Sequence, residues 1–295
     1  MVELASDGGT LPNFDKLWNY DDPASTETKF RELLSAAKES NNLSYYIQLL
    51  TQLARTEGLQ RKFEDAHRTL NEAEDLLKKA DARTRIRYLL ERGRVFNSSG
   101  QLAKARPFFL QAWEFANSPR EDFYAIDAAH MMAIAEPQTS KMEWNLKALE
   151  IANASSETRA RRWRGSLYNN IGWDYFESKE YDKALEAFKK ALRAREEAEQ
   201  FPEIRVARWC IAKTLRVLNR VNEALEIQEA LLAEYERSKQ QDGYVYEELA
   251  ECLTALRRQD EAKKYFAKAY TELSKDIWLK EKEPGRLKRL KELSN

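Results

Sequence analysis

The chain has 295 residues, of which 33% are charged and 43% hydrophobic, with only 9 glycines and 7 prolines. This composition suits a helical protein with many short connections. The 49 basic residues equal the 49 acidic ones, so no net charge draws the chain to nucleic acid or to an anionic membrane. Two cysteines, Cys210 and Cys252, are too few for a disulfide framework, and we expect reduced thiols.

The N-terminal region carries no targeting signal. Residues 1–23 lack the basic start and apolar core of a signal peptide, and no apolar run approaches the roughly 18 residues that span a bilayer. We therefore expect a cytoplasmic protein without a membrane partner. Residues 1–23 instead form an N-terminal arm, whose apolar cluster we expect to pack on the first helices; the cluster comprises Phe14, Leu17, Trp18 and Tyr20.

A helix is predicted at 24–42, where Ser25 or Thr26 can cap it and an apolar stripe begins at Phe30. This unpaired helix is expected to be an N-terminal cap. Helical pairs are then predicted at 43–80, 82–116, 120–154, 160–198, 203–238 and 242–276. The turn inside the first pair is expected at Glu57–Gln60. A C-terminal capping segment follows at 277–295, split by Pro284 and Gly285.

The stretch Gly165–Ala198 shows the pairing pattern most clearly. Gly172 and Ala184 are small residues that let two helix backbones approach, while Tyr175 and Phe188 fill the space beside them. The same arrangement, a small residue followed twelve residues later by alanine, recurs along the chain. The pairs are Ala54 and Ala66, Gly93 and Ala105, Gly172 and Ala184, Ala212 and Ala224, and Ala250 and Ala262.

With this spacing, Gly165–Ala198 resembles a tetratricopeptide repeat. The resemblance implies an all-α fold, a right-handed superhelix (α-solenoid) of antiparallel helix pairs with about six repeats and terminal capping helices. The third repeat is degenerate, because Ala129 is matched at the twelve-residue offset by Lys141. We keep it as a repeat because its apolar residues retain the helical period.

The resemblance also implies that the first helix of each pair lines a concave groove. The predicted partner-binding residues are Asn169, Asn170, Trp173, Trp209, Lys213, Arg216, Arg94 and His130. Asn170 occupies the position at which peptide-binding members of the family hold a ligand backbone, and an amide can both donate and accept a hydrogen bond. Lys213 and Arg216 are suited to an acidic side chain or a terminal carboxylate. The groove is expected to be basic at its N-terminal end and acidic around Glu247, Glu248 and Glu251.

Each of these assignments has a structural alternative. Trp173 and Trp209 are as well explained as core residues packed against the next repeat, and Arg216 as one partner of an ion pair between repeats. The carboxylate clamp that captures chaperone C-termini is not reproduced, because Ile126 and His130 stand at two of its positions.

No catalytic motif is present. Glycine-rich phosphate loops, zinc-ligand spacings and serine-nucleophile motifs are absent, and the 2 histidines lie in different repeats. We therefore expect no enzyme, no metal and no cofactor. The predicted function is a protein-interaction scaffold that binds a peptide segment of a partner, as a monomer or weak homo-oligomer. The alternative is a ligand-responsive regulator that senses a short peptide or small molecule.

Overall fold

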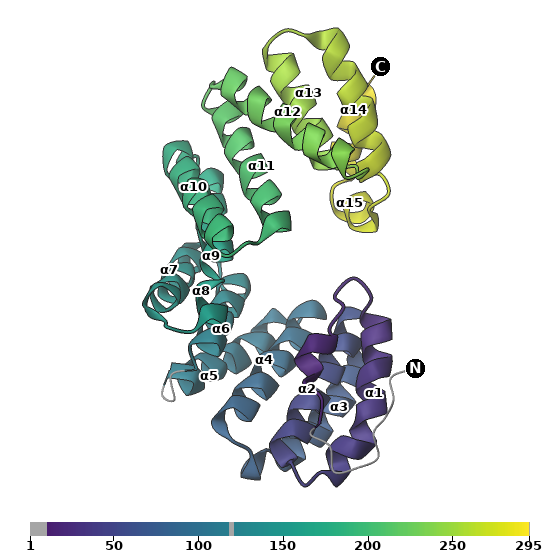
Figure 1. The fold of residues 1–295 in the computed structure, drawn as a ribbon, viewed down its shortest axis with the longest axis vertical. Helices are drawn as coiled ribbons and strands as arrows, with labels where there is room; N and C mark the ends of the chain where they lie inside the picture. The colour runs from purple at the N-terminus through teal and green to yellow at the C-terminus, as the bar shows by residue number, and fades with distance from the viewer. Residues whose placement is uncertain (1–10, 118–120, 295) are drawn as a thin grey trace. The chain divides into compact units, whose positions relative to one another are not determined.

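The computed structural model describes residues 11–117 and 121–294, and within them every regular element is a helix (Figure 1). Residues 1–10 of the predicted arm, residue 120 of the predicted third repeat and Asn295 lie outside the described part. The helices form two compact units, divided between Arg161 and Arg162. In the described ranges, no helix combines the length and the apolar character needed to cross a membrane.

The first unit begins with a short 3-10 helix, η1, at Phe14–Leu17. Its further helices are α1 (Pro23–Glu39), α2 (Leu43–Leu59), α3 (Phe63–Leu76), η2 (Leu77–Lys79), α4 (Ala82–Ser98), α5 (Leu102–Asn117), α6 (Asp122–Ala135), α7 (Gln138–Ala154) and α8 (Thr158–Arg161). The side chain that caps α1 belongs to Asp22, which accepts from the backbone N–H of Ser25. The predicted caps, Ser25 and Thr26, are therefore wrong, because both lie inside the helix.

The second unit contains the remaining helices. They are α9 (Arg164–Glu177), α10 (Tyr181–Glu197), α11 (Phe201–Val217), α12 (Val221–Arg237), α13 (Gly243–Ala255), α14 (Gln259–Leu273), α15 (Ile277–Lys282) and α16 (Pro284–Leu293). Consecutive helices pack as adjacent pairs in both units: α2 with α3, α4 with α5, α6 with α7, α9 with α10, α11 with α12, and α13 with α14. The protein is thus an all-α solenoid of helical pairs.

The contact between paired helices is centred on the small residues. All ten of the small residues in the recurring pairs are buried. Large apolar residues of the second helices fill the space around them: Phe109 and Phe188 are 0% exposed and Phe266 is 2% exposed. The close approach of the paired backbones excludes water from these rings. Burial of apolar side chains between neighbouring helices is therefore the main favourable contribution to folding.

Five of the six turns inside the pairs share one unusual backbone conformation. One residue in each of five turns has a positive φ: Arg61, Gly100, Lys179, Asn219 and Arg257, with φ from 61° to 79°. Only Gly100 is a glycine, which is the residue that normally adopts this conformation. The turn predicted at Glu57–Gln60 is therefore displaced: α2 continues through Gly58 to Leu59, and Arg61 makes the reversal.

Candidate functional site

Six of the predicted binding residues lie on two neighbouring helices of the second unit. Asn169, Asn170 and Trp173 are on α9, and Trp209, Lys213 and Arg216 are on α11; all six are half-buried. The two helices contact each other at this surface. The ring centres of Trp173 and Trp209 are 6.2 Å apart, and the thiol of Cys210 lies 3.7 Å from the Asn169 side-chain oxygen. The residues therefore form one cluster.

An aromatic row runs through this cluster onto a third helix. Tyr244 of α13 lies with its ring centre 6.1 Å from that of Trp209, whose indole N–H donates to the Tyr244 carbonyl oxygen at 3.0 Å. The ring of Trp173 also packs edge-on against that of Phe188 on α10, with ring centres 5.4 Å apart. The two tryptophans thus pack between repeats, as the structural alternative requires, and still keep part of their surface exposed. We call Trp173, Trp209 and Tyr244 the aromatic row.

The two cations of the cluster share a single buried glutamate. Glu248 of α13 is 1% exposed; Arg216 Nη2 lies 3.1 Å and Lys213 Nζ 3.9 Å from its carboxylate. Burial alone would lower the pKa of Arg216, but the hydrogen bond and charge of Glu248 outweigh it and raise the pKa. Arg216 is therefore an inter-repeat ion-pair partner, whereas the ammonium of Lys213 is also 5.1 Å from the Trp209 ring centre, at the edge of the aromatic row.

The predicted acidic end of the groove is neutralised by its neighbours. Glu248 pairs with Arg216, while Glu247 accepts from Arg286 Nε at 3.1 Å and Glu251 from Arg289 Nη1 at 2.6 Å. Both of these arginines belong to α16, the C-terminal capping helix. The two pairs with α16 hold the cap on the last repeat, and all three carboxylates are paired with arginines of the protein itself.

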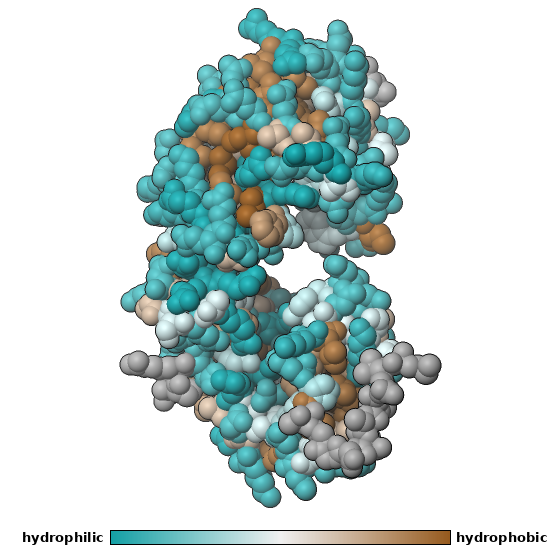
Figure 2. Space-filling view, viewed as in Figure 1, coloured by the Kyte–Doolittle hydropathy of each residue, from teal (hydrophilic) through white to brown (hydrophobic). Residues whose placement is uncertain are grey.

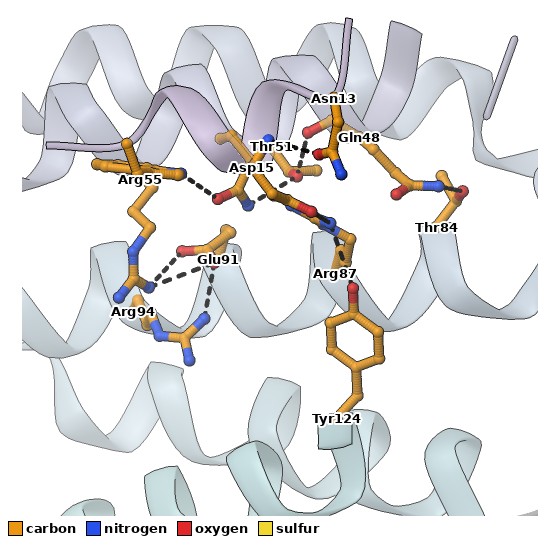
Figure 3. A network of polar contacts seen from close by, with 12 residues as sticks. Asn13, Asp15, Gln48, Thr51, Arg55, Thr84, Arg87, Glu91, Arg94 and Tyr124 are labelled. Atoms are coloured by element: carbon orange, nitrogen blue, oxygen red, sulfur yellow. Dashed lines mark hydrogen bonds and ion pairs between the residues drawn. The ribbon is translucent and has the colours of Figure 1, made fainter. Parts of the chain in front are cut away.

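The other two predicted residues, Arg94 of α4 and His130 of α6, belong to the first unit. Arg94 Nη1 lies 2.7 Å and Arg55 Nη1 3.2 Å from Glu91 (Figure 3). Arg94 Nη2 lies 2.5 Å from Asp127. Burial would raise the pKa of Asp127, but the Arg94 charge holds it below its ordinary value, while burial lowers the pKa of His130. The charge of Arg94 is matched inside the protein, which argues against a role in partner binding.

The N-terminal arm covers the surface beside this network. Asp15 forms two hydrogen bonds with the guanidinium of Arg87 on α4, at 2.7 and 2.9 Å, and Figure 3 shows it pointing toward that group. Trp18 donates its indole N–H to Gln52 of α2 at 3.0 Å, and Phe14 is 5% exposed. The apolar cluster of the arm thus packs on the first helices as expected, but the sequence analysis missed the ion pair.

Comparison with known proteins agrees with the repeated geometry. The family model described as "Tetratricopeptide repeat" matches residues 166–197, which cover most of α9 and α10. The chain contains a tetratricopeptide repeat. In a comparison with curated proteins, no sequence matches it.

Solved structures of low sequence identity share the fold of this tetratricopeptide repeat protein. The apo form of RapI is 16% identical, with a TM-score of 0.68 over 90% of this chain and 76% of RapI. A tetratricopeptide repeat protein from Parabacteroides merdae is 17% identical, with a TM-score of 0.53 over 95% of this chain and 96% of that one. NprR in complex with its cognate peptide NprX is 16% identical, with a TM-score of 0.53 over 94% of this chain and 80% of NprR.

The surface of this tetratricopeptide repeat protein combines apolar and polar groups on the first helices of adjacent pairs. In the second unit, the aromatic row offers flat apolar surface, with the amides of Asn169 and Asn170 on α9 and the ammonium of Lys213 on α11. On the face drawn in Figure 2, brown apolar residues lie among teal polar ones in both units. Within the described ranges, no group of three or more metal-ligating side chains is found.

Proposed function

We propose that this tetratricopeptide repeat protein is a non-enzymatic interaction scaffold, and that the first helices of its second unit hold an extended peptide segment of a partner. The observation that carries the proposal is the aromatic row, because partly exposed indoles that are held in place by packing are among the side chains that most often dominate protein interfaces. The peptide complex of NprR, a protein of the same fold, supports a peptide as the class of ligand.

The chemistry around the row defines the peptide. Trp173 and Trp209 would cover an apolar side chain of the ligand, and Lys213 would attract an acidic one, because Glu248 is shared with Arg216 and leaves one positive charge in excess. Asn169 and Asn170 would hydrogen-bond the peptide backbone, since an amide supplies both a donor and an acceptor. The expected ligand is therefore an extended segment with one apolar and one acidic side chain.

The test is to select binding peptides without assuming their sequence. A phage-displayed library of random twelve-residue peptides is panned on the full chain, and the selected peptides are synthesised with a fluorescent label for anisotropy titration. We expect Trp209→Ala combined with Lys213→Ala to weaken their binding by about tenfold or more, as for hot-spot residues. Trp278→Ala, at an exposed tryptophan of α15, is the matched control and should leave binding unchanged. Equal affinity for the parent and the double variant would show that the site lies elsewhere.

A ligand-responsive regulator is the second candidate, and the peptide complex of NprR is the observation that favours it. A regulator of this kind would change its dimensions when the selected peptide binds, whereas a passive scaffold would not. Small-angle X-ray scattering of the full chain with and without the peptide distinguishes the two. An unchanged radius of gyration at saturating peptide would leave the scaffold as the function.

A further inference from the structure

The arm supplies the carboxylate for a buried cation of the repeat array. Arg87 on α4 is 7% exposed, and its two terminal nitrogens contact Asp15 of the arm and, at 3.2 Å, the hydroxyl of Tyr124 on α6. Its Nε has no hydrogen-bond partner among the described residues. A buried guanidinium that loses its carboxylate is costly, so this surface requires an acidic group from whatever covers it.

Aromatic contacts place the rest of the arm on α1, α2 and α4. The ring centre of Phe14 is 5.0 Å from that of Tyr45 on α2, and the guanidinium of Arg87 lies 5.3 Å from the Phe14 ring. The guanidinium of Arg55 lies 6.0 Å from Trp18 and 5.7 Å from Tyr20, whose rings are stacked. Phe14, Asp15 and Trp18 thus each meet a complementary group of α2 or α4, and we call this surface the arm groove.

The arm is held mainly by side-chain contacts and has little regular structure of its own. Phe14 is its one fully buried side chain in residues 11–22, whereas Asn13, Lys16, Asn19 and Tyr20 are exposed. Its regular structure is the four-residue helix η1. It contacts α1 through hydrogen bonds between Asn19 and Thr26, at 3.0 and 3.2 Å, and through the rings of Phe14 and Trp18 against Phe30. A segment that is bound by side-chain contacts of this kind, and that contributes no helix to the repeats, can leave the surface without unfolding the helices that carry it.

We propose that the arm groove on α2 and α4 is a second binding surface of this protein, occupied in this structure by residues 11–22 and open to a partner segment of the same chemistry. That segment carries an aromatic side chain directly before an acidic one and an indole three residues after the acid, as Phe14, Asp15 and Trp18 do. The surface lies in the first unit, so the proposal does not depend on the aromatic row. Binding of the partner displaces the arm, because one carboxylate at a time pairs with Arg87.

The test supplies the arm's own sequence in trans. A fluorescent peptide of residues 11–22, LPNFDKLWNYDD, is titrated into the full-length parent and into the variant Phe14→Ala with Asp15→Ala, whose arm no longer competes. We expect the variant to bind the peptide at least about tenfold more tightly, because the groove is open in a larger fraction of molecules. The matched control is the same peptide carrying Asp15→Asn, which should bind the variant about tenfold more weakly without a charge for Arg87.

Two controls separate this proposal from the first. Adding Trp209→Ala to the arm variant should leave peptide binding unchanged, whereas it weakens the peptides selected on the aromatic row. Hydrogen exchange of residues 11–22 in the single variant Asp15→Asn, which retains Phe14, should be faster than in the parent. Absence of binding to the arm variant, equal binding to parent and variant, or equal binding of the Asp15→Asn peptide would each overturn the proposal.

Discussion

The ring of Phe188 lies against the backbone of Gly172, so that a Cβ atom added at Gly172 would come within 2.5 Å of Phe188 Cε1. The same relationship joins Gly93 and Phe109, where the added atom would lie 2.4 Å from Phe109 Cε1. Both phenylalanines are 0% exposed and belong to the second helix of their pair. The glycines are therefore needed for space, since both lie inside helices with ordinary backbone angles.

Enlarging Gly172 should destabilise the second unit. We expect Gly172→Ala to cost about 1–3 kcal/mol, and Gly172→Leu more, because the Phe188 ring is enclosed and has no space to move into. The measurement is the free energy of unfolding in urea. Gly58→Ala is the control: its added Cβ would lie 3.5 Å from Val95, an ordinary contact, so it should be neutral or stabilise by up to about 1 kcal/mol. Equal losses for both variants would contradict the packing.

The pH dependence of stability should reveal the contacts of Glu27. Burial would raise the pKa of Glu27, but hydrogen bonds from Lys62, Arg31 and Gln60 outweigh it and lower the pKa to about 2. Because the folded pKa lies below the ordinary value of 4.5, the carboxylate stabilises the fold above that pH, and its contribution is lost as the pH falls toward 2.

The corresponding variant is Glu27→Gln, which removes the charge and keeps the shape. Its melting temperature should lie below that of the parent at neutral pH, and the difference should shrink steadily as the pH is lowered from about 5 to 3. Circular dichroism at a series of pH values measures this. A difference that stays constant over the range would mean that Glu27 is not ionised through these contacts.

Removing Arg94 should destabilise the first unit strongly. Arg94→Met leaves Asp127 without its closest cation and takes one of two arginines from Glu91, and both acids are buried. We expect a loss of about 3–5 kcal/mol, as when one partner of a buried ion pair is removed. The control is Arg68→Met, whose ion pair with Asp65 is largely exposed and should contribute less than about 1 kcal/mol. Urea denaturation of both variants compares them; a loss for Arg94→Met as small as the control's would refute a structural role.

The two cysteines should be unreactive in the folded protein. Burial raises the pKa of Cys210 to about 12 and that of Cys252 to about 12, so both remain thiols and are shielded from reagents. We expect slow reaction with a disulfide reagent at pH 8, followed by release of two equivalents when guanidinium is added. Ser178→Cys, at an exposed position, should add one rapidly reacting equivalent. Rapid modification of the parent would show that α11 or α13 opens readily.

The sequence was enough to predict the helical pairs and the family. Small residues such as Gly172 and Ala184 recur at a fixed offset because every pair needs the same close approach of two backbones, and this periodic requirement leaves a periodic pattern. The aromatic and amide cluster on α9 and α11 could be located for the same reason, since its residues stand at fixed offsets from the small ones. The left-handed residues of the turns, such as Arg61, carried no signal because they are not glycines.

Only the tertiary structure decided how the charges are used. Asp15 of the arm reaches Arg87, 72 residues further along the chain, and this contact lies outside the repeat pattern. The buried pairs between repeats do join equivalent positions of neighbouring repeats: Arg55 with Glu91, Arg94 with Asp127, and Lys213 with Glu248. An ion pair depends on where two side chains end after the helices have packed, and helical spacing does not encode that position. For this reason the repeats, the two tryptophans and the packing of the arm were visible in the sequence, whereas the partner of each charge, such as Asp15 for Arg87, was not.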